Sequence, residues 1–451
     1  MKGVLVILDG LGDLPSKQLG GKTPLEAANT PNLDFFATYG KTGYMYPVKP
    51  NFIPGSDESI VSLFGNNLSD SSRGQLEARG AGIKTSHGDL ALRVNFASIN
   101  SLSEGDIIDR RVGRTLTTKE AEILSKDLNK IKLSCNFIFK STIQHRAVLV
   151  LKGGFSDNII CNDPIYSRDN PKNSEKISTF KALDEEEDTQ YTVNILREFA
   201  EKAFELLDKH PINEKRRIKG FPPANYLLMR GAGSEIPKLK KYRKWLSIVY
   251  MPLEIGFSEL SGMNVFSFEY PELKNLDSYE NLWEGLKKAC NFTIDTIKKN
   301  YKNSDYAYIH IKETDLPGHD NKPIEKKMML EYLDKTLFQF LREFAIQKKI
   351  KIVVTGDHST PCKLKSHSAD PVPVLFYEGG LNPKESFFDS FLNNFNTNNI
   401  QKFFSRKEKN DERTKSKESI KKIKFCERTV KSGALGEIKG KDLLNKVGFN
   451  K

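Results

Sequence analysis

Four short apolar runs recur along the chain and predict the strands of a buried sheet. They are GVLVIL at 3–8, DYAYIHI at 305–311, KIVVTG at 351–356 and VPVLFY at 372–377. Strands covered on both faces read as nearly continuous apolar runs, whereas half-exposed strands alternate apolar and polar residues. Segments 279–300 and 322–349 carry apolar residues at three- and four-residue steps, which is typical of helices. Because strand and helix alternate, we expect an α/β fold with a parallel sheet and crossover helices.

The middle of the chain has a different pattern. From about Arg79 to Met263 it contains β-rich pieces such as DLALRVNFAS, NFIFKST and HRAVLVLKG, and a predicted helix from about Tyr191 to Lys209. We therefore expect an α+β domain at 79–263, inserted into a first domain that comprises residues 1–78 and 264–451.

Composition narrows the class of protein. Apolar residues make up 38% of the 451 residues, yet no apolar run approaches the roughly 18 residues of a membrane span. We expect no membrane partner. The five cysteines are odd in number, widely spread and without a CxxC pair, which favours reduced thiols and the cytoplasm.

The net charge of +12 is concentrated in one segment. Between Gln401 and Ser432 there are 12 Lys and Arg residues but only five Asp and Glu residues. We interpret 401–432 as a solvated, Lys-rich insertion within the first domain. The rest of the chain is mildly basic, so nucleic acid is not expected as a partner, although a nucleic-acid-binding arm remains the alternative for this segment.

Acidic and imidazole side chains gather at or just beyond the ends of the predicted strands. These residues are Asp9, Asp315, His319, Asp357, His358 and His367. Each alone is explained by a helix cap or a surface histidine, but open α/β sheets place their sites at this edge. Two divalent ions about 4 Å apart need several carboxylates, and imidazoles favour Mn, Zn or Co over Mg or Ca. A pair of metals implies a phosphoryl group or a related anion as substrate.

A candidate nucleophile lies in IPGSDESIVSLFG at 53–65. We expect Ser56 at the N-cap of a helix and Ser59 facing solvent, which is a complete structural explanation for both. The functional alternative is that the helix start stabilises a phosphorylated Ser56, whose hydroxyl a metal ion activates.

Longer motifs carry a resemblance to a known family. They include MKGVLVILDGLGDLPSKQLGGKTPLEAANTPNLD at the start, GSD, DRRVGR, HRAVLVLKG, ANYLLMRGAG, TDLPGHDNKP, GDHSTPCKLKSHSADPVPVLF and GALGEIKGKDLL. In spacing and order these motifs resemble the archaeal-type 2,3-bisphosphoglycerate-independent phosphoglycerate mutases of the alkaline phosphatase superfamily. The resemblance implies an alkaline-phosphatase-like, mostly parallel sheet sandwiched by helices, with an inserted domain that covers the substrate.

The resemblance also implies an activity and its cofactors. The enzyme would be an isomerase that interconverts 3-phosphoglycerate and 2-phosphoglycerate in glycolysis and gluconeogenesis through a phosphoserine intermediate. It would use two divalent ions, with manganese favoured and magnesium, cobalt or zinc open, and no 2,3-bisphosphoglycerate. Its partner would be the small-molecule substrate.

Residue roles follow from the matching positions. One metal would be held by Asp315, His319 and His367, and the other by Asp9, Asp357, His358 and the nucleophile Ser56. The implied substrate-binding residues are Asp109, Arg110, Arg111, Arg114, His145, Arg146 and Arg230. Guanidinium groups bond carboxylate or phosphate bidentately, whereas pairing with acids is the structural alternative for each arginine.

Departures from the family pattern keep other functions open. Glu58 is an extra acid beside Ser56, Ile60 replaces a histidine, and Ile255 and Glu259 stand where the family has Lys and Arg. Losing positive charge weakens phosphate binding. One alternative is a phosphatase or phosphonate hydrolase that uses the same serine. A second is a catalytically weakened relative that binds a phosphorylated metabolite or nucleic acid.

Overall fold

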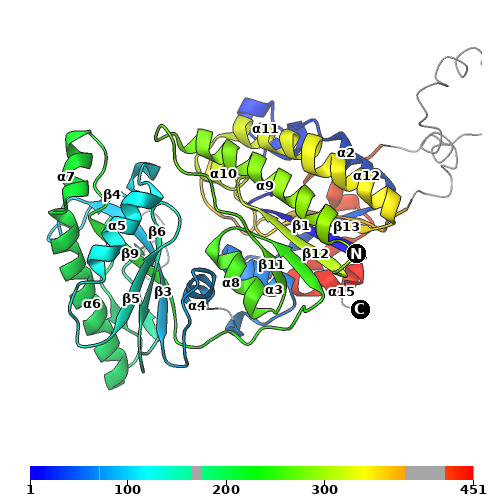
Figure 1. Cartoon of the computed structure of the whole chain (residues 1–451). Coiled ribbons are helices and arrows are strands. Elements are labelled where there is room, and N and C mark those ends of the chain that lie inside the picture. Colours follow the sequence, from blue (N-terminus) through cyan, green and yellow to red (C-terminus); the bar gives the residue numbers. More distant parts are fainter. Residues whose placement is uncertain (71, 165–174, 381–421, 450–451) are drawn as a thin grey trace, which may run out of the picture.

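The computed structural model describes residues 1–70, 72–164, 175–380 and 422–449 (Figure 1). An eight-stranded sheet has the strand order β11-β10-β12-β1-β13-β14-β2-β15. Its strands are β11 (Asn264–Phe266), β10 (Trp245–Ile248), β12 (Tyr306–Ile311), β1 (Gly3–Leu8), β13 (Lys351–Gly356), β14 (Val372–Tyr377), β2 (Lys41–Tyr46) and β15 (Gly436–Lys439). Only β14 runs antiparallel to its neighbours. The four predicted strands and the α/β class with a mostly parallel sheet are confirmed.

Helices cover both faces of this sheet, and the strands divide their side chains between the two. Val4, Val6 and Leu8 of β1 belong to one core cluster, and Leu5 and Ile7 to another. The first cluster lies under α2 (Pro31–Tyr39), α9 (Ser278–Asn300), α11 (Pro323–Leu333) and α12 (Gln339–Lys348). The second lies under α3 (Ser56–Leu63), α8 (Pro252–Leu260) and α15 (Leu443–Val447). Burial on both faces accounts for the continuous apolar runs.

A second sheet, antiparallel throughout, stands beside the first (Figure 1). Its central strand β3 (Leu90–Ile99) pairs with β4 (Ile107–Asp109), β6 (Arg146–Leu151) and β9 (Tyr226–Gly233), and β5 (Phe137–Ser141) pairs with β6. Helices α5 (Thr118–Leu128) and α6 (Glu187–Asp208) pack against it in a separate core, and α7 (Pro211–Ile218) follows α6. The predicted helix from about Tyr191 to Lys209 corresponds to α6.

The chain rejoins the eight-stranded sheet earlier in the sequence than expected. Trp245–Ile248 lies inside the predicted inserted range 79–263, but as β10 it pairs with β12 of the eight-stranded sheet. Helix α8 packs on α4 (Arg73–Gly80) through glycines: a Cβ on Gly80 would lie 1.8 Å from the carbonyl oxygen of Pro252. The far boundary therefore falls before Trp245 rather than after Met263.

The end of the predicted Lys-rich insertion is part of the fold. Residues 401–421 lie outside the described residues, whereas Phe425 is fully buried and Cys426 is 1% exposed. Lys424 Nζ donates to the Thr30 hydroxyl at 2.8 Å, and Glu427 accepts from Thr23 Oγ1 at 2.6 Å. The solvated-insertion interpretation is thus wrong for 422–432, because a buried aromatic side chain and hydrogen bonds from two charged side chains anchor this segment to the first domain.

No helix among the described residues is long and apolar enough to cross a membrane.

We predict that Phe425→Ala lowers the free energy of unfolding by about 3–5 kcal/mol, because it leaves a cavity in the core. Ile324→Ala, at a side chain that is 49% exposed, should change it by less than about 0.5 kcal/mol. Urea unfolding followed by circular dichroism measures both. A loss below about 1 kcal/mol for Phe425→Ala would show that 422–432 contributes nothing to the core.

Candidate functional site

Four segments place acidic and imidazole side chains at one edge of the large sheet. Asp9 follows β1, Asp315 follows β12, and Asp357 and His358 follow β13. His367 precedes β14, and because β14 is antiparallel to β13, its beginning lies at the edge where the parallel strands end. The topology therefore assembles all the predicted metal-ligand segments at one edge.

A first group of possible metal ligands is wholly buried. One ligand atom each from Asp9, His310 and Asp357 lie within 4.8 Å of one another. His310 Nε2 is 3.7 Å from Asp357 Oδ2, and the Tyr308 hydroxyl lies 2.8 Å from His310 Nδ1, which fixes the ring. Buried Asp9 Oδ1, His310 Nε2 and Asp357 Oδ2 form no hydrogen bond of good geometry among the described residues, although His358 Nε2 lies 3.2 Å from Asp9 Oδ1 and 3.4 Å from Asp357 Oδ2. Such orphaned donor atoms fit a divalent cation.

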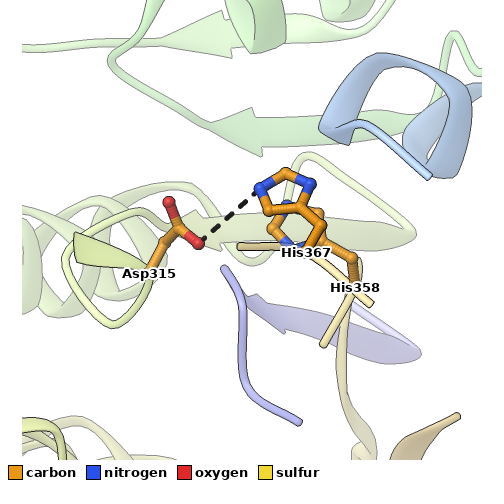
Figure 2. A group of neighbouring side chains, drawn as sticks. All are labelled: Asp315, His358 and His367. Carbon is orange, nitrogen blue, oxygen red and sulfur yellow. Dashed lines mark ion pairs between the residues drawn. The ribbon is translucent and has the colours of Figure 1, made fainter. Parts of the chain in front are cut away.

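A second group comprises Asp315, His358 and His367 (Figure 2). The rings of His358 and His367 stack with centroids 3.6 Å apart, and His367 Nε2 lies 4.0 Å from Asp315 Oδ1. His319 flanks the group, with Nε2 3.3 Å from Asp315 Oδ2 and Nδ1 3.1 Å from the Lys365 carbonyl oxygen.

His358 lies where the two groups meet. As expected, its Nε2 is close to Asp9 and Asp357, at 3.2 Å from Asp9 Oδ1 and 3.4 Å from Asp357 Oδ2. A ligand atom of His358 also lies within 4.8 Å of those of Asp315 and His367, and His310, which is not among the predicted ligands, lies with Asp9 and Asp357.

Burial makes the charges of this cluster interdependent. Burial and the carboxylate of Asp9 raise the pKa of Asp357 to about 7. Burial opposes a positive charge on His358, but Asp357 and Asp9 raise the pKa of its imidazole to about 9. Lys312 pairs with Asp9 and also with Glu254, at 2.8 Å. The raised pKa values of Asp357 and His358 indicate an excess of buried negative charge, which bound cations would neutralise.

Ser56 lies beside the cluster, at the first turn of α3. Gly55 is the N-cap, so Ser56 is the first helical residue and the expected N-cap position is wrong. Its Oγ lies 3.2 Å from His358 Nε2. The extra acid, Glu58, turns back and accepts from the Gly55 amide at 2.8 Å, so it caps the helix. Ser59, expected to face solvent, is fully buried.

A cavity of about 90 Å³ joins this cluster to the second sheet. Its lining includes Asp9, Ser56, Asp315, His319, His367 and Lys312 from the first sheet and its helices, together with five arginines, Arg73, Arg93, Arg111, Arg146 and Arg230. Three of the seven predicted substrate residues, Arg111, Arg146 and Arg230, line it. Arg73 and Arg93, which sequence reasoning missed, do so as well and share the carboxylate of Glu77.

The other four predicted substrate residues lie outside this lining. Arg110 pairs with Asp163, and Arg114 pairs with Asp320. Asp109 accepts from the Arg111 amide at 2.7 Å. His145 is 7% exposed and has no hydrogen-bond partner at Nδ1 among the described residues. Asp163 also binds Arg230 at 3.0 Å, so Asp109 and Asp163 each contact an arginine of the cavity lining.

The remaining departures from the family pattern do not face the cavity. Ile60 is 1% exposed in the core, and Ile255 packs against the same cluster. Glu259 Oε2 accepts from Arg79 Nε at 2.5 Å. In this chain Lys312 contributes an ammonium group to the cavity wall.

Comparison with known proteins agrees with the geometry. A family model described as 2,3-bisphosphoglycerate-independent phosphoglycerate mutase matches residues 37–213. A mutase of that name from Thermococcus kodakarensis is 42% identical, over 86% of this chain and 91% of the relative. Its counterpart from Pyrococcus abyssi is 41% identical, over 84% and 89%.

Solved structures show the same relationship. A protein from Pyrococcus horikoshii superposes with a TM-score of 0.69 at 30% identity, over 100% of this chain and 98% of that one. The cofactor-independent phosphoglycerate mutase of Thermoplasma acidophilum gives 0.54 at 26% identity, over 100% and 99%. At 42% identity across most of both chains, the protein belongs to the family of 2,3-bisphosphoglycerate-independent phosphoglycerate mutases.

Proposed function

We propose that the protein interconverts 3-phosphoglycerate and 2-phosphoglycerate, in glycolysis and gluconeogenesis, through a phosphoserine at Ser56. One observation carries this proposal: Ser56 lines a cavity together with members of the Asp and His cluster and five arginines. All five cysteines are free, which supports a cytoplasmic location.

Two divalent ions fit the donor set, and manganese suits its mixture of carboxylates and imidazoles. Asp9, His310 and Asp357 would hold one ion, and Asp315, His358 and His367 the other, with His319 beside the second. When bound, such ions offset phosphoryl charge and lower the pKa of a nearby hydroxyl.

Ser56 acts as the transient acceptor of the phosphoryl group. A bond forms between Ser56 Oγ and phosphorus while the bond between phosphorus and the 3-oxygen of the substrate breaks. The glycerate 2-oxygen then attacks the same phosphorus, and Ser56 regains its hydroxyl. Each oxygen that leaves gains a proton and each that attacks loses one, so the reaction balances without water or a bisphosphorylated cofactor. The start of α3 supports the phosphoserine, because its amides face the added charge.

The arginine wall retains the glycerate between the two transfers. Arg111, Arg146 and Arg230 face the cavity, where guanidinium groups can bond a carboxylate bidentately. Arg73 is held by Asp57 at 2.9 Å and by Glu77 at 3.2 Å, which orients its guanidinium before the substrate arrives. A retained glycerate reattacks, whereas a lost one leaves a phosphoserine for water to hydrolyse.

We predict that Ser56→Ala abolishes formation of the phosphoenzyme, whereas Ser59→Ala retains it. Acid quenching after mixing with 3-phosphoglycerate, followed by peptide mass spectrometry, locates the phosphate. Ser59 is the matched control, because it lies three residues away on the same helix and is buried in the core. Phosphate on Ser59, or turnover by Ser56→Ala, would refute the role of Ser56.

We predict that Arg111→Lys raises the KM for 3-phosphoglycerate about tenfold, since losing a bidentate contact costs about 1.4 kcal/mol. It should also increase free phosphate relative to 2-phosphoglycerate. Arg110→Lys is the control: Arg110 is adjacent in sequence, but it pairs with Asp163, which a lysine can also do. Equal effects of the two substitutions would contradict the arginine wall. A wild-type protein that releases phosphate faster than 2-phosphoglycerate would be a phosphatase instead.

A further inference from the structure

A second and larger cavity, of about 670 Å³, lies at the opposite edge of the eight-stranded sheet. Its lining includes the residues just before three strands: Lys2 before β1, Lys244 before β10 and Asp305 before β12. These strands are parallel, so their beginnings and the candidate active site lie at opposite ends. A six-residue strand such as β1 spans about 20 Å, which separates this cavity from the mutase site.

The lining of this second cavity is strongly basic. Its charged residues are Lys2, Lys240, Lys241, Arg243, Lys244 and Lys441, against Asp305 as the only acid. Six positive charges less one negative charge leave an excess of five on the described lining. Asp305 is shared, at 3.4 Å from Lys2 Nζ and 3.9 Å from Lys244 Nζ. Lys240, Arg243 and Lys441 form no ion pair among the described residues, so their charges are available to an anionic ligand.

Part of the cavity lining is aromatic. Trp245, Tyr306 and Phe449 pack together, with ring centroids 5.0 Å apart for the first two and 4.8 Å apart for the last two. Gly65, also in the lining, has a φ of +69°, a backbone conformation that favours glycine. A hollow lined by exposed basic side chains suits a compact anion.

We propose that this cavity binds a small polyanion carrying two or more phosphate groups, at a site distinct from the mutase centre. Several ammonium groups and one guanidinium converge on a space whose volume is in the range of about 300–1,000 Å³ that small-molecule sites occupy. Linked phosphates match this arrangement because one molecule then neutralises several cations at once. The free polyphosphate chain and a nucleoside triphosphate share this chemistry, and the experiment separates them.

Trp245 provides a local reporter. The chain has two tryptophans, and the other, Trp283, lies in α9 on the other face of the sheet. In a Trp283→Phe background, emission reports Trp245 alone. Tripolyphosphate and ATP are titrated at constant ionic strength, and calorimetry on the wild-type protein gives the stoichiometry. We expect one saturable site per chain for tripolyphosphate; tighter binding of ATP would add recognition of the nucleoside.

Charge reversal tests the location. Lys240→Glu with Lys441→Glu should weaken tripolyphosphate binding at least tenfold and leave mutase turnover unchanged. Lys215→Glu with Lys219→Glu is the matched control, because both lysines are exposed at α7 and its C-terminal end. The proposal is overturned by the absence of saturable binding in both assays. Equal weakening by the control pair, or a short RNA binding more tightly than tripolyphosphate, would also overturn it.

Discussion

Buried negative charge at the carboxyl edge of the large sheet is the constraint on which the rest of this structure depends. Asp9 and Asp357 are buried side by side, Asp315 lies half-buried in the adjoining group, and buried carboxylates without compensating charge are unfavourable. The described surroundings offer one ammonium group, Lys312, and several imidazoles. Protons or metal ions must supply the remaining compensation, so the elements that create the site also make it dependent on cations.

Further ion pairs extend from this cluster toward the second sheet. Lys312 joins Asp9 to Glu254 of α8, and α8 packs closely on α4. From α4, Glu77 pairs with Arg93 of the second sheet. Burial opposes its charge, but Arg93 and Arg73 hold the pKa of Glu77 at about 2. Two groups of ion pairs, joined by the packing of α8 on α4, thereby connect Arg73 and Arg93 to the Asp and His cluster.

Sequence patterns predict the buried strands and most residues of the Asp and His cluster, because both can be recognised from residues that are adjacent in the sequence. A buried strand followed by Asp is visible in the letters, as at Asp9 and Asp357. His310 could not be found in this way, because it lies within the apolar run that predicts β12 and its role depends on the direction its side chain faces. The YIHI pattern, with a histidine inside a buried strand, was the available signal.

Other differences arose from long-range packing. Three basic residues line the cavity only because the fold brings the two sheets together there: Lys312, Arg73 and Arg93. Residues 422–432 read as solvated because charges dominate their composition, yet Phe425 reaches the core and Lys424 finds acceptors almost 400 positions away. The boundary near β10 was misplaced because strand pairing, rather than composition, decides which sheet a short strand joins.

The most direct test of the central claim is the number of manganese ions that metal-free protein binds in equilibrium dialysis. Two ions per chain are predicted for the wild type. His310→Ala should remove one, while His210→Ala, whose imidazole pairs with Asp127 in the second domain, should leave both. Fewer than two ions in the folded wild type, or two retained by His310→Ala, would contradict the account.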